Sequence, residues 1–144
     1  MKALVIHGPN LNLLGTREPD VYGDVTLEEI DTLLGKAAGG SDWELDIHQT
    51  AREGEIIELL HAAIGSVDGA ILNPAAYSHT SRAIADAIRS VPYPVVEVHL
   101  SNIHAREDWR KTSVTGEAAA GVVSGFGPAS YLLGLEALRG LVSK

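Results

Sequence analysis

Short apolar runs alternate along the chain with segments whose apolar side chains recur at helical spacing. Five runs rich in β-branched and aliphatic residues predict strands, and these are residues 3–6, 43–48, 68–72, 94–98 and 119–123. Four other segments predict helices, and these are residues 27–39, 55–64, 78–88 and 128–141. The residues expected to cap the first and third helices are Thr26 or Asp24 and Ser78 or Thr80.

This alternation implies a parallel sheet with helices on both faces, joined by right-handed crossovers. Five strands within 144 residues favour a flavodoxin-like α/β fold, a three-layer sandwich whose five-stranded parallel sheet has the order 2-1-3-4-5. The chain has no linker or repeat, and a single domain is expected over residues 1–144. Ligands of such sheets bind beyond the carboxyl ends of the strands, here near the switch point between strands one and three.

Composition narrows the class of protein. The hydrophobic fraction of 45% and the charged fraction of 21% are typical of a soluble globular protein. The lack of cysteine excludes disulfides and thiolate metal sites and fits a reducing cytoplasm. A net charge of −8 argues against nucleic-acid binding. No apolar run approaches the roughly 20 residues of a membrane span. We therefore expect a cytoplasmic protein that binds neither nucleic acid nor membrane.

The loop after the first strand is rich in polar residues and lies at the expected ligand edge. It reads GPNLNLLGTREPDVYG over residues 8–23 and carries Asn10, Asn12, Arg17, Glu18 and Tyr22. Each has a simpler explanation, because asparagines suit turns, an arginine and a glutamate suit a surface ion pair, and a tyrosine can pack its ring on the scaffold. Their gathering on one loop at this edge favours a functional interpretation.

The ends of strands three and four add an amide, two imidazoles and a carboxylate. Asn73 either satisfies loop backbone or binds a ligand, and His79 is either a solvated cap or a ligand-binding group over a helix N-terminus. His99 follows Glu97 by two residues on a strand, so both lie on one face. A carboxylate beside an imidazole fixes its tautomer and raises its pKa, which suits a proton carrier. A purely structural pair is the alternative.

Motifs for nucleotide, metal or covalent chemistry are absent from the sequence. It contains no GxGxxG, GxxxxGK[ST] or GxSxG motif and no metal-ligand spacing. The four lysines lie outside apolar segments, which argues against a Schiff base. No cofactor and no metal are expected. We assign no chemistry to His7, His48 or His61, and expect His61 to be buried or half-buried.

Four blocks of the sequence resemble type II 3-dehydroquinate dehydratase, and these are GPNLNLLGTREPDVYG (8–23), NPAAYSHTS (73–81), EVHLSNIHARE (97–107) and GPASYLLGLEAL (127–138). The resemblance implies a flavodoxin-like hydro-lyase of the shikimate pathway, which supplies chorismate and the aromatic amino acids. Such an enzyme dehydrates 3-dehydroquinate to 3-dehydroshikimate by anti elimination through an enolate, without metal or Schiff base. The family is usually a homododecamer built as four trimers.

The resemblance also implies residue roles. Tyr22 matches the general base, Arg17 the essential loop arginine and His99 the general acid. Glu97 is expected to orient that acid, and Asn10 to help stabilise the enolate through a bound water. The residues expected to bind the substrate's carboxylate and hydroxyls are Asn73, His79, Leu100, Ser101 and Arg110, with Asp86 reaching the site of a neighbouring subunit.

A tyrosine with the ordinary pKa of about 10 is mostly protonated at neutral pH, so a tyrosine base needs nearby cations. Arg17, which is close in sequence, and Arg106, on the loop after strand four, are the expected sources. A loop that carries both base and arginine can close over substrate and exclude water. Gly15 and Gly23 bracket it and are candidate hinges.

The chain departs from the family pattern in two places. Ala51 lacks the polar side chain that is more common in the family at this position, and Arg52 adds a charge. We expect these two changes to alter a subunit contact or the surroundings of the site. Residues 109–114 also differ, but Arg110 and Ser113 are retained.

Two other functions fit this fold. The first is a non-catalytic binding module, such as a receiver or a flavin carrier. A receiver needs an acidic cluster after strand one, where this chain has His7-Gly8-Pro9-Asn10. A flavin carrier needs hydroxyl-rich phosphate loops and stacking aromatic residues, and aromatic residues make up only 5% of this chain. A relative that binds another cyclic polyol acid is the second alternative, and only an assay separates it from the dehydratase.

Overall fold

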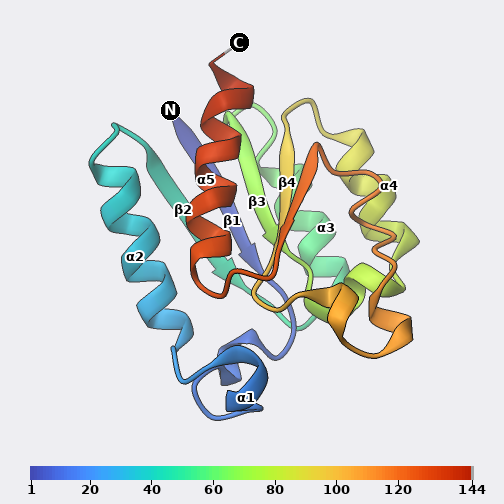
Figure 1. Cartoon of the computed structure of the whole chain (residues 1–144). Helices are drawn as coiled ribbons and strands as arrows, with labels where there is room; N and C mark the ends of the chain where they lie inside the picture. Colours follow the sequence, from blue (N-terminus) through green and yellow to red (C-terminus); the bar gives the residue numbers. More distant parts are fainter. Residues whose placement is uncertain (144) are drawn as a thin grey trace.

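The computed structural model describes residues 1–143, which form one parallel sheet flanked by helices (Figure 1). Its strands are β1 (Lys2–His7), β2 (Glu44–Gln49), β3 (Gly69–Asn73), β4 (Val95–His99) and β5 (Gly121–Ser124). Every neighbouring pair is parallel, and the order is β2-β1-β3-β4-β5. The predicted flavodoxin-like fold and strand order are therefore confirmed.

Within residues 1–143 the α-helices are α1 (Pro19–Tyr22), α2 (Leu27–Gly39), α3 (Glu53–Ala62), α4 (Arg82–Ser90) and α5 (Ala129–Val142). Short 3-10 helices follow strands β1, β3 and β4, and these are η1 (Leu11–Leu13), η2 (Ala75–His79), η3 (Ile103–Ala105) and η4 (Asp108–Arg110). Periodicity predicted the four longer helices but not the short ones, because three to five residues carry no full apolar stripe.

The start of the third predicted helix was wrong. The N-cap of α4 is Ser81, whose hydroxyl accepts a hydrogen bond from the backbone N–H of Ile84 at 2.9 Å. The expected caps Ser78 and Thr80 instead lie in and just after η2, so His79 precedes the helix rather than opening it. Thr26, one of the two expected caps of α2, does accept from the backbone of the first turn.

The sheet has two hydrophobic faces, because alternate side chains of a strand point to opposite sides. On β1, Ala3 and Val5 pack with α2 and α5, whereas Leu4 and Ile6 pack with α3 and α4. Figure 1 shows α2 and α5 in front of the sheet and α3 behind it. The two cores together give the predicted three layers.

The same alternation decides which helices each polar strand end meets. His7 has the parity of Val5, and its ring hydrogen-bonds Tyr131 of α5. Glu97 has the parity of Val95, which packs on the α3–α4 side, so Glu97 and His99 lie on that side as expected. The carboxyl edge therefore presents different polar groups to the two helical layers.

Only glycine fits at the turn after β1. A Cβ on Gly8 would lie 2.8 Å from the carbonyl carbon of Pro74 and 2.9 Å from the carbonyl oxygen of Asn73. The backbone N–H of Gly8 donates to that Asn73 oxygen at 2.8 Å. This close approach joins the ends of β1 and β3 and sets the loop after β1 beside the residues that follow β3.

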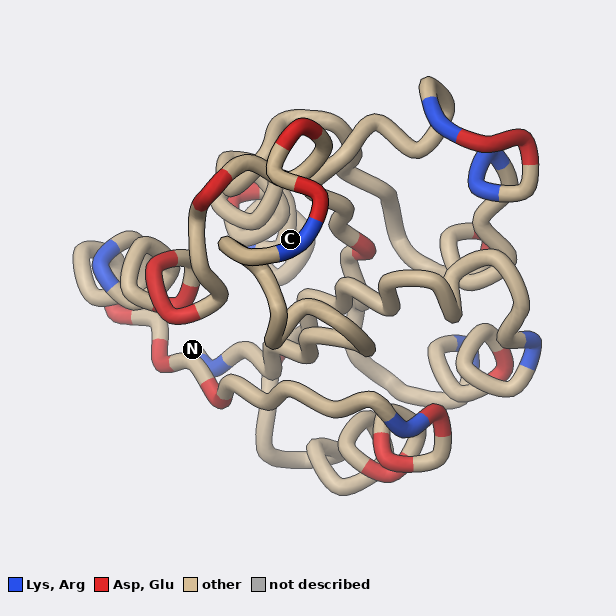
Figure 2. Tube along the Cα trace, turned by 90° about the horizontal axis from the view of Figure 1, so that it is seen from below, with Lys and Arg blue, Asp and Glu red and all other residues tan. Residues whose placement is uncertain are grey.

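Charged residues lie mainly on the helices and loops that surround the sheet (Figure 2). Glu97 in β4 is an exception, with an exposed fraction of 0%. No helix within residues 1–143 is long and apolar enough to cross a membrane.

Candidate active site

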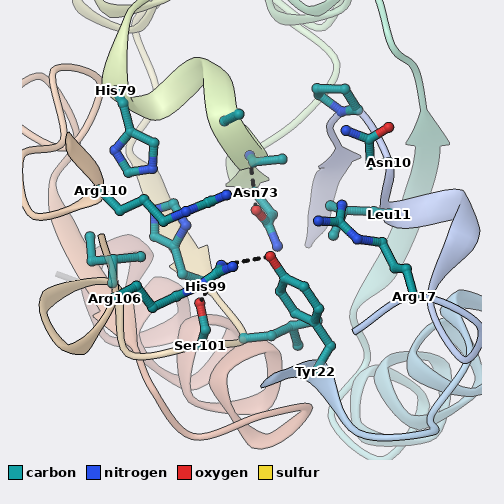
Figure 3. A pocket seen from close by; sticks show the side chains of 15 residues that line it. Asn10, Leu11, Arg17, Tyr22, Asn73, His79, His99, Ser101, Arg106 and Arg110 are labelled. Atoms are coloured by element: carbon teal, nitrogen blue, oxygen red, sulfur yellow. Dashed lines mark hydrogen bonds between the residues drawn. The ribbon is translucent and has the colours of Figure 1, made fainter. Parts of the chain in front are cut away.

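A cavity opens at the carboxyl edge of the sheet, beyond the ends of β1, β3 and β4 (Figure 3). About 540 Å³ of empty space lies within its bounds, part of it open to solvent at the mouth. Nine of the residues singled out from the sequence line it, and these are Asn10, Arg17, Tyr22, Asn73, His79, His99, Leu100, Ser101 and Arg110. The strand-end rule therefore located the cavity.

Tyr22 stands in the cavity between two guanidinium groups. Its hydroxyl accepts a hydrogen bond from Nη1 of Arg106 at 2.7 Å. The guanidinium carbons of Arg17 and Arg106 lie 4.9 and 5.2 Å from the centre of the phenol ring. The ring also packs against the hydrophobic core on the α2–α5 side. The scaffold interpretation thus holds for the ring, while the hydroxyl faces the cavity (Figure 3).

Arg17 also forms the surface ion pair that was its simpler explanation. Its Nη2 donates to Glu18 at 2.7 Å, and Nη2 of Arg106 lies 3.8 Å from the same carboxylate. The hydrogen bond from Arg17 lowers the pKa of Glu18, with smaller contributions from the charge of Arg106. One carboxylate therefore sits against both arginines that flank Tyr22.

Glu97 and His99 form a buried pair on β4. Nε2 of His99 lies 2.9 Å from the carboxylate of Glu97, which also accepts hydrogen bonds from the hydroxyls of Ser113 (2.6 Å) and Thr115. Because a carboxylate accepts only, Nε2 of His99 carries a hydrogen and Nδ1 is the nitrogen left for a ligand. His99 lines the cavity, whereas Glu97 lies behind it and supports it.

Two residues in the left-handed region line the cavity. Asn10 has φ of 69°, so the turn explanation holds for it as well as the cavity position. Ala75 has φ of 53°, an unusual value for a residue with a Cβ and one that costs on the order of 1–3 kcal/mol. Such strain is concentrated at functional sites. Asn12, by contrast, only receives a long contact from Gln49.

His79 and Arg110 form the wall opposite Asn10 (Figure 3). Nδ1 of His79 donates to the carbonyl oxygen of Thr112 at 2.8 Å. Burial lowers the pKa of His79, and this effect exceeds the opposite effect of its hydrogen bond to the carbonyl oxygen of Thr112. Arg110 stacks over the ring of Trp109 with its guanidinium carbon 4.1 Å from the ring centre. The wall thus combines a neutral imidazole with a held cation.

Asp86 is not brought into this cavity. It lies exposed on α4, where it lines a separate surface depression together with Arg82 and Arg89. Ala51 and Arg52 are exposed as well, and Arg52 pairs with Glu55 at 2.6 Å. The expected effect of these two departures on subunit contacts stays a prediction.

Sequence reasoning missed parts of the site and misplaced one residue. Arg106 was expected only as a source of positive charge, yet it lines the cavity and bonds Tyr22 directly. Its position on the loop after a strand end was the available signal. His61, expected to be buried or half-buried, is exposed, because it lies on the outer face of α3. No group of three His, Asp or Glu side chains within residues 1–143 could hold a metal ion.

Comparison with known proteins gives one consistent answer. The sequence profile of the family described as Dehydroquinase class II matches residues 1–139. A 3-dehydroquinate dehydratase of Thermoanaerobacter pseudethanolicus is 54% identical over 138 residues, covering 96% of this chain and 93% of the relative. One from Desulforudis audaxviator is 52% identical over 144 residues, covering 100% and 96%.

A solved structure agrees with the sequence relatives. The crystal structure of type II dehydroquinase from Butyrivibrio crossotus superposes with a TM-score of 0.95 at 38% identity, covering 96% of this chain and 97% of that one. Residues 1–139, which the family profile matches, include all five strands and every residue that lines the cavity.

Proposed function

The chain belongs to the class II dehydroquinase family, and from this premise we infer that it is a 3-dehydroquinate dehydratase, a hydro-lyase of the shikimate pathway. We propose further that it works by anti elimination through an enolate. The observation that carries the mechanism is the placement of a phenol flanked by two guanidinium groups in the same cavity as a carboxylate-bound imidazole.

Tyr22 is the proposed general base. Positive charge from Arg17 and Arg106 stabilises a phenolate over a phenol, because each guanidinium lies against the ring or the hydroxyl. The phenolate takes the proton from the carbon next to the substrate's ketone, and the electron pair moves onto the ketone oxygen. Asn10 helps to stabilise the resulting enolate through a bound water.

His99 is the proposed general acid. The buried carboxylate of Glu97 holds Nε2–H and stabilises the imidazolium, so Nδ1–H is the proton available to the cavity. As the enolate collapses, the carbon–oxygen bond of the leaving hydroxyl breaks and this proton completes a water molecule. The proton on Tyr22 then returns through solvent to His99, which balances the cycle.

The remaining lining residues are proposed to hold the substrate. Arg110 suits a carboxylate, since a stacked guanidinium presents donors in a fixed plane. Asn73, His79, Ser101 and the Leu100 backbone suit hydroxyl and carboxylate oxygens. Gly15 and Gly23, with φ of 92° and 73°, are the proposed hinges of a lid that carries Arg17 and Tyr22.

We also propose a cytoplasmic homo-oligomer, a dodecamer of four trimers. The exposed position of Asp86, away from its own cavity, supports a role at a neighbouring subunit's site. Sedimentation equilibrium measures the assembly directly. A monomer with full activity would contradict the role of Asp86.

The first experiment mixes the purified protein with 3-dehydroquinate and follows the ultraviolet absorbance of the conjugated enone product. We expect absorbance to rise in the presence of a chelator and of borohydride, since the proposed chemistry uses neither metal nor Schiff base. Tyr22→Phe should lower kcat by at least about 100-fold, because the base is lost while the ring packing is kept.

The matched control is Tyr77→Phe. The hydroxyl of Tyr77 donates to the carbonyl oxygen of Ala51, outside the cavity, so its removal should leave kcat unchanged. An active, correctly assembled Tyr22→Phe would disprove the assigned base. A flat trace from folded wild-type protein would favour a different cyclic polyol acid as the ligand.

A further inference from the structure

On the α2–α5 side of the sheet, a chain of hydrogen-bonded polar groups runs from Asp31 at the surface of α2 through buried residues to the cavity. Asp31 on α2 lies 2.7 Å from Nε2 of His7, and Nδ1 of His7 lies 2.8 Å from the hydroxyl of Tyr131 on α5. That hydroxyl in turn meets the amide nitrogen of Asn73 at 3.1 Å. His7 and Tyr131 are fully buried, and Asn73 is 2% exposed.

The donors and acceptors in this chain have one consistent direction. The carboxylate of Asp31 only accepts, so Nε2 of His7 carries a hydrogen, and in the neutral ring Nδ1 is then the acceptor. Burial raises the pKa of Tyr131 well above the usual tyrosine value, so its hydroxyl keeps its proton and donates it to Nδ1. The oxygen of Tyr131 is then free to accept from Asn73.

The far end of the amide is held as well. Oδ1 of Asn73 accepts from the backbone N–H of Ala75 at 3.1 Å, which fixes which end of the amide is nitrogen. Of the two hydrogens on Nδ2, one is used by Tyr131. The second is the one that a ligand can use, because Asn73 lines the cavity (Figure 3).

We propose that Asp31, His7 and Tyr131 are positioning residues that hold the amide of Asn73 so that its second N–H meets an oxygen of the bound cyclic polyol acid. The proposal rests on the proposed function for the identity of that ligand, 3-dehydroquinate. Neither Asp31 nor His7 lines the cavity, so both act only through Tyr131 and Asn73.

Asp31→Asn is the informative variant, because it is isosteric and the side chain of Asp31 is 33% exposed. A carboxamide can donate to Nε2 of His7, which allows the tautomer with hydrogen on Nδ1. That tautomer and Asn73 would both donate to Tyr131, and the hydroxyl hydrogen would lose its acceptor. We expect KM for 3-dehydroquinate to rise about three- to tenfold with a smaller change in kcat, the size of one lost hydrogen bond.

Glu28→Gln is the matched control. It removes one negative charge from an exposed position on the same helix and touches no member of the chain of hydrogen bonds. Its KM should equal that of the wild type. If both variants raise KM equally, charge loss on α2 is the cause and the proposal is wrong.

A double-mutant cycle with Asn73→Ala separates positioning from general destabilisation. If Asp31 acts through Asn73, Asp31→Asn should change KM by less than about 1.5-fold in the Asn73→Ala background, because coupled residues are not additive. An equal rise in KM in both backgrounds would overturn the proposal.

Nitrogen NMR of the His7 ring tests the hydrogen-bond chain apart from any activity. In the wild type we expect hydrogen on Nε2 and an unprotonated Nδ1, and in Asp31→Asn a shift of hydrogen toward Nδ1. A wild-type ring protonated on Nδ1 would disprove the chain. If the protein has no dehydratase activity but the ring behaves as expected, the proposed function fails while the orientation of Asn73 stands.

Discussion

Apart from the half-buried Asp46–His48 pair of β2, two carboxylate–histidine pairs lie near the same edge of the sheet, one on each face, and their second ring nitrogens meet different surroundings. His99 pairs with Glu97 at 2.9 Å, and His7 pairs with Asp31 at 2.7 Å. The Glu97–His99 pair turns its second ring nitrogen to the cavity, whereas the Asp31–His7 pair turns its own to the buried hydroxyl of Tyr131. We therefore propose that the Glu97–His99 pair carries a proton, whereas the Asp31–His7 pair positions the amide of Asn73.

The difference shows that a histidine beside a carboxylate does not by itself identify an acid or a base. What the second nitrogen meets decides the role, because the first nitrogen is occupied by the carboxylate in both pairs. The pairs also differ in their supports. Glu97 accepts from Ser113 and Thr115, while Asp31 lies at the protein surface.

Loss of the His99 imidazole is expected to impair catalysis more than any other change described below. His99→Ala should lower kcat by about 100- to 10,000-fold, since it removes the proposed general acid. Steady-state kinetics with 3-dehydroquinate measure this, and circular dichroism verifies the fold. His104→Ala, on the exposed loop nearby, is the control and should keep full activity. Comparable kcat values for the two variants would remove His99 from the mechanism.

An intermediate effect is expected when the buried hydrogen bonds of Tyr131 to His7 and Asn73 are removed. Tyr131→Phe removes a hydroxyl with two partners, His7 and Asn73, and should lower the free energy of unfolding by about 1–3 kcal/mol. Tyr93→Phe is the matched control, because the hydroxyl of Tyr93 has a single partner, the carbonyl of Leu60, and should cost less. Urea unfolding gives both values. A smaller loss of unfolding free energy for Tyr131→Phe than for Tyr93→Phe would show that the hydrogen bonds of Tyr131 to His7 and Asn73 do not stabilise the fold.

His79 differs from both pairs, because its ring bonds the backbone carbonyl of Thr112, and its removal should have a small effect on stability. Burial lowers the pKa of His79 in the folded protein below its ordinary value of 6.5. As pH falls below that value, the unfolded chain takes up a proton that the native state refuses, so stability falls with falling pH until His79 protonates in the native state.

His79→Gln should therefore flatten the dependence of unfolding free energy on pH just below 6.5. Urea midpoints at a series of pH values measure the slope for the variant and the wild type. An unchanged slope would show that His79 takes up its proton equally in the folded and unfolded chains.

Much of the fold followed from patterns that are local in the sequence. Strand and helix periodicity located all five strands, because apolar spacing reflects the geometry of each element. The Glu97–His99 pair was equally local, since residues two apart on a strand share a face. The short helices and the true cap of α4 were not predicted, because several hydroxyl residues compete for one capping position.

Patterns in the sequence were enough to predict the strands, the longer helices, the edge where the cavity lies and most of the residues that line it. They could not predict which distant groups meet, because Arg106 and Tyr22 are 84 residues apart and His7 and Tyr131 are 124 residues apart. No local pattern encodes such contacts, because they depend on how the layers pack and where each loop returns. The packing of the layers therefore brings Arg106 against Tyr22 and the hydroxyl of Tyr131 against the amide of Asn73.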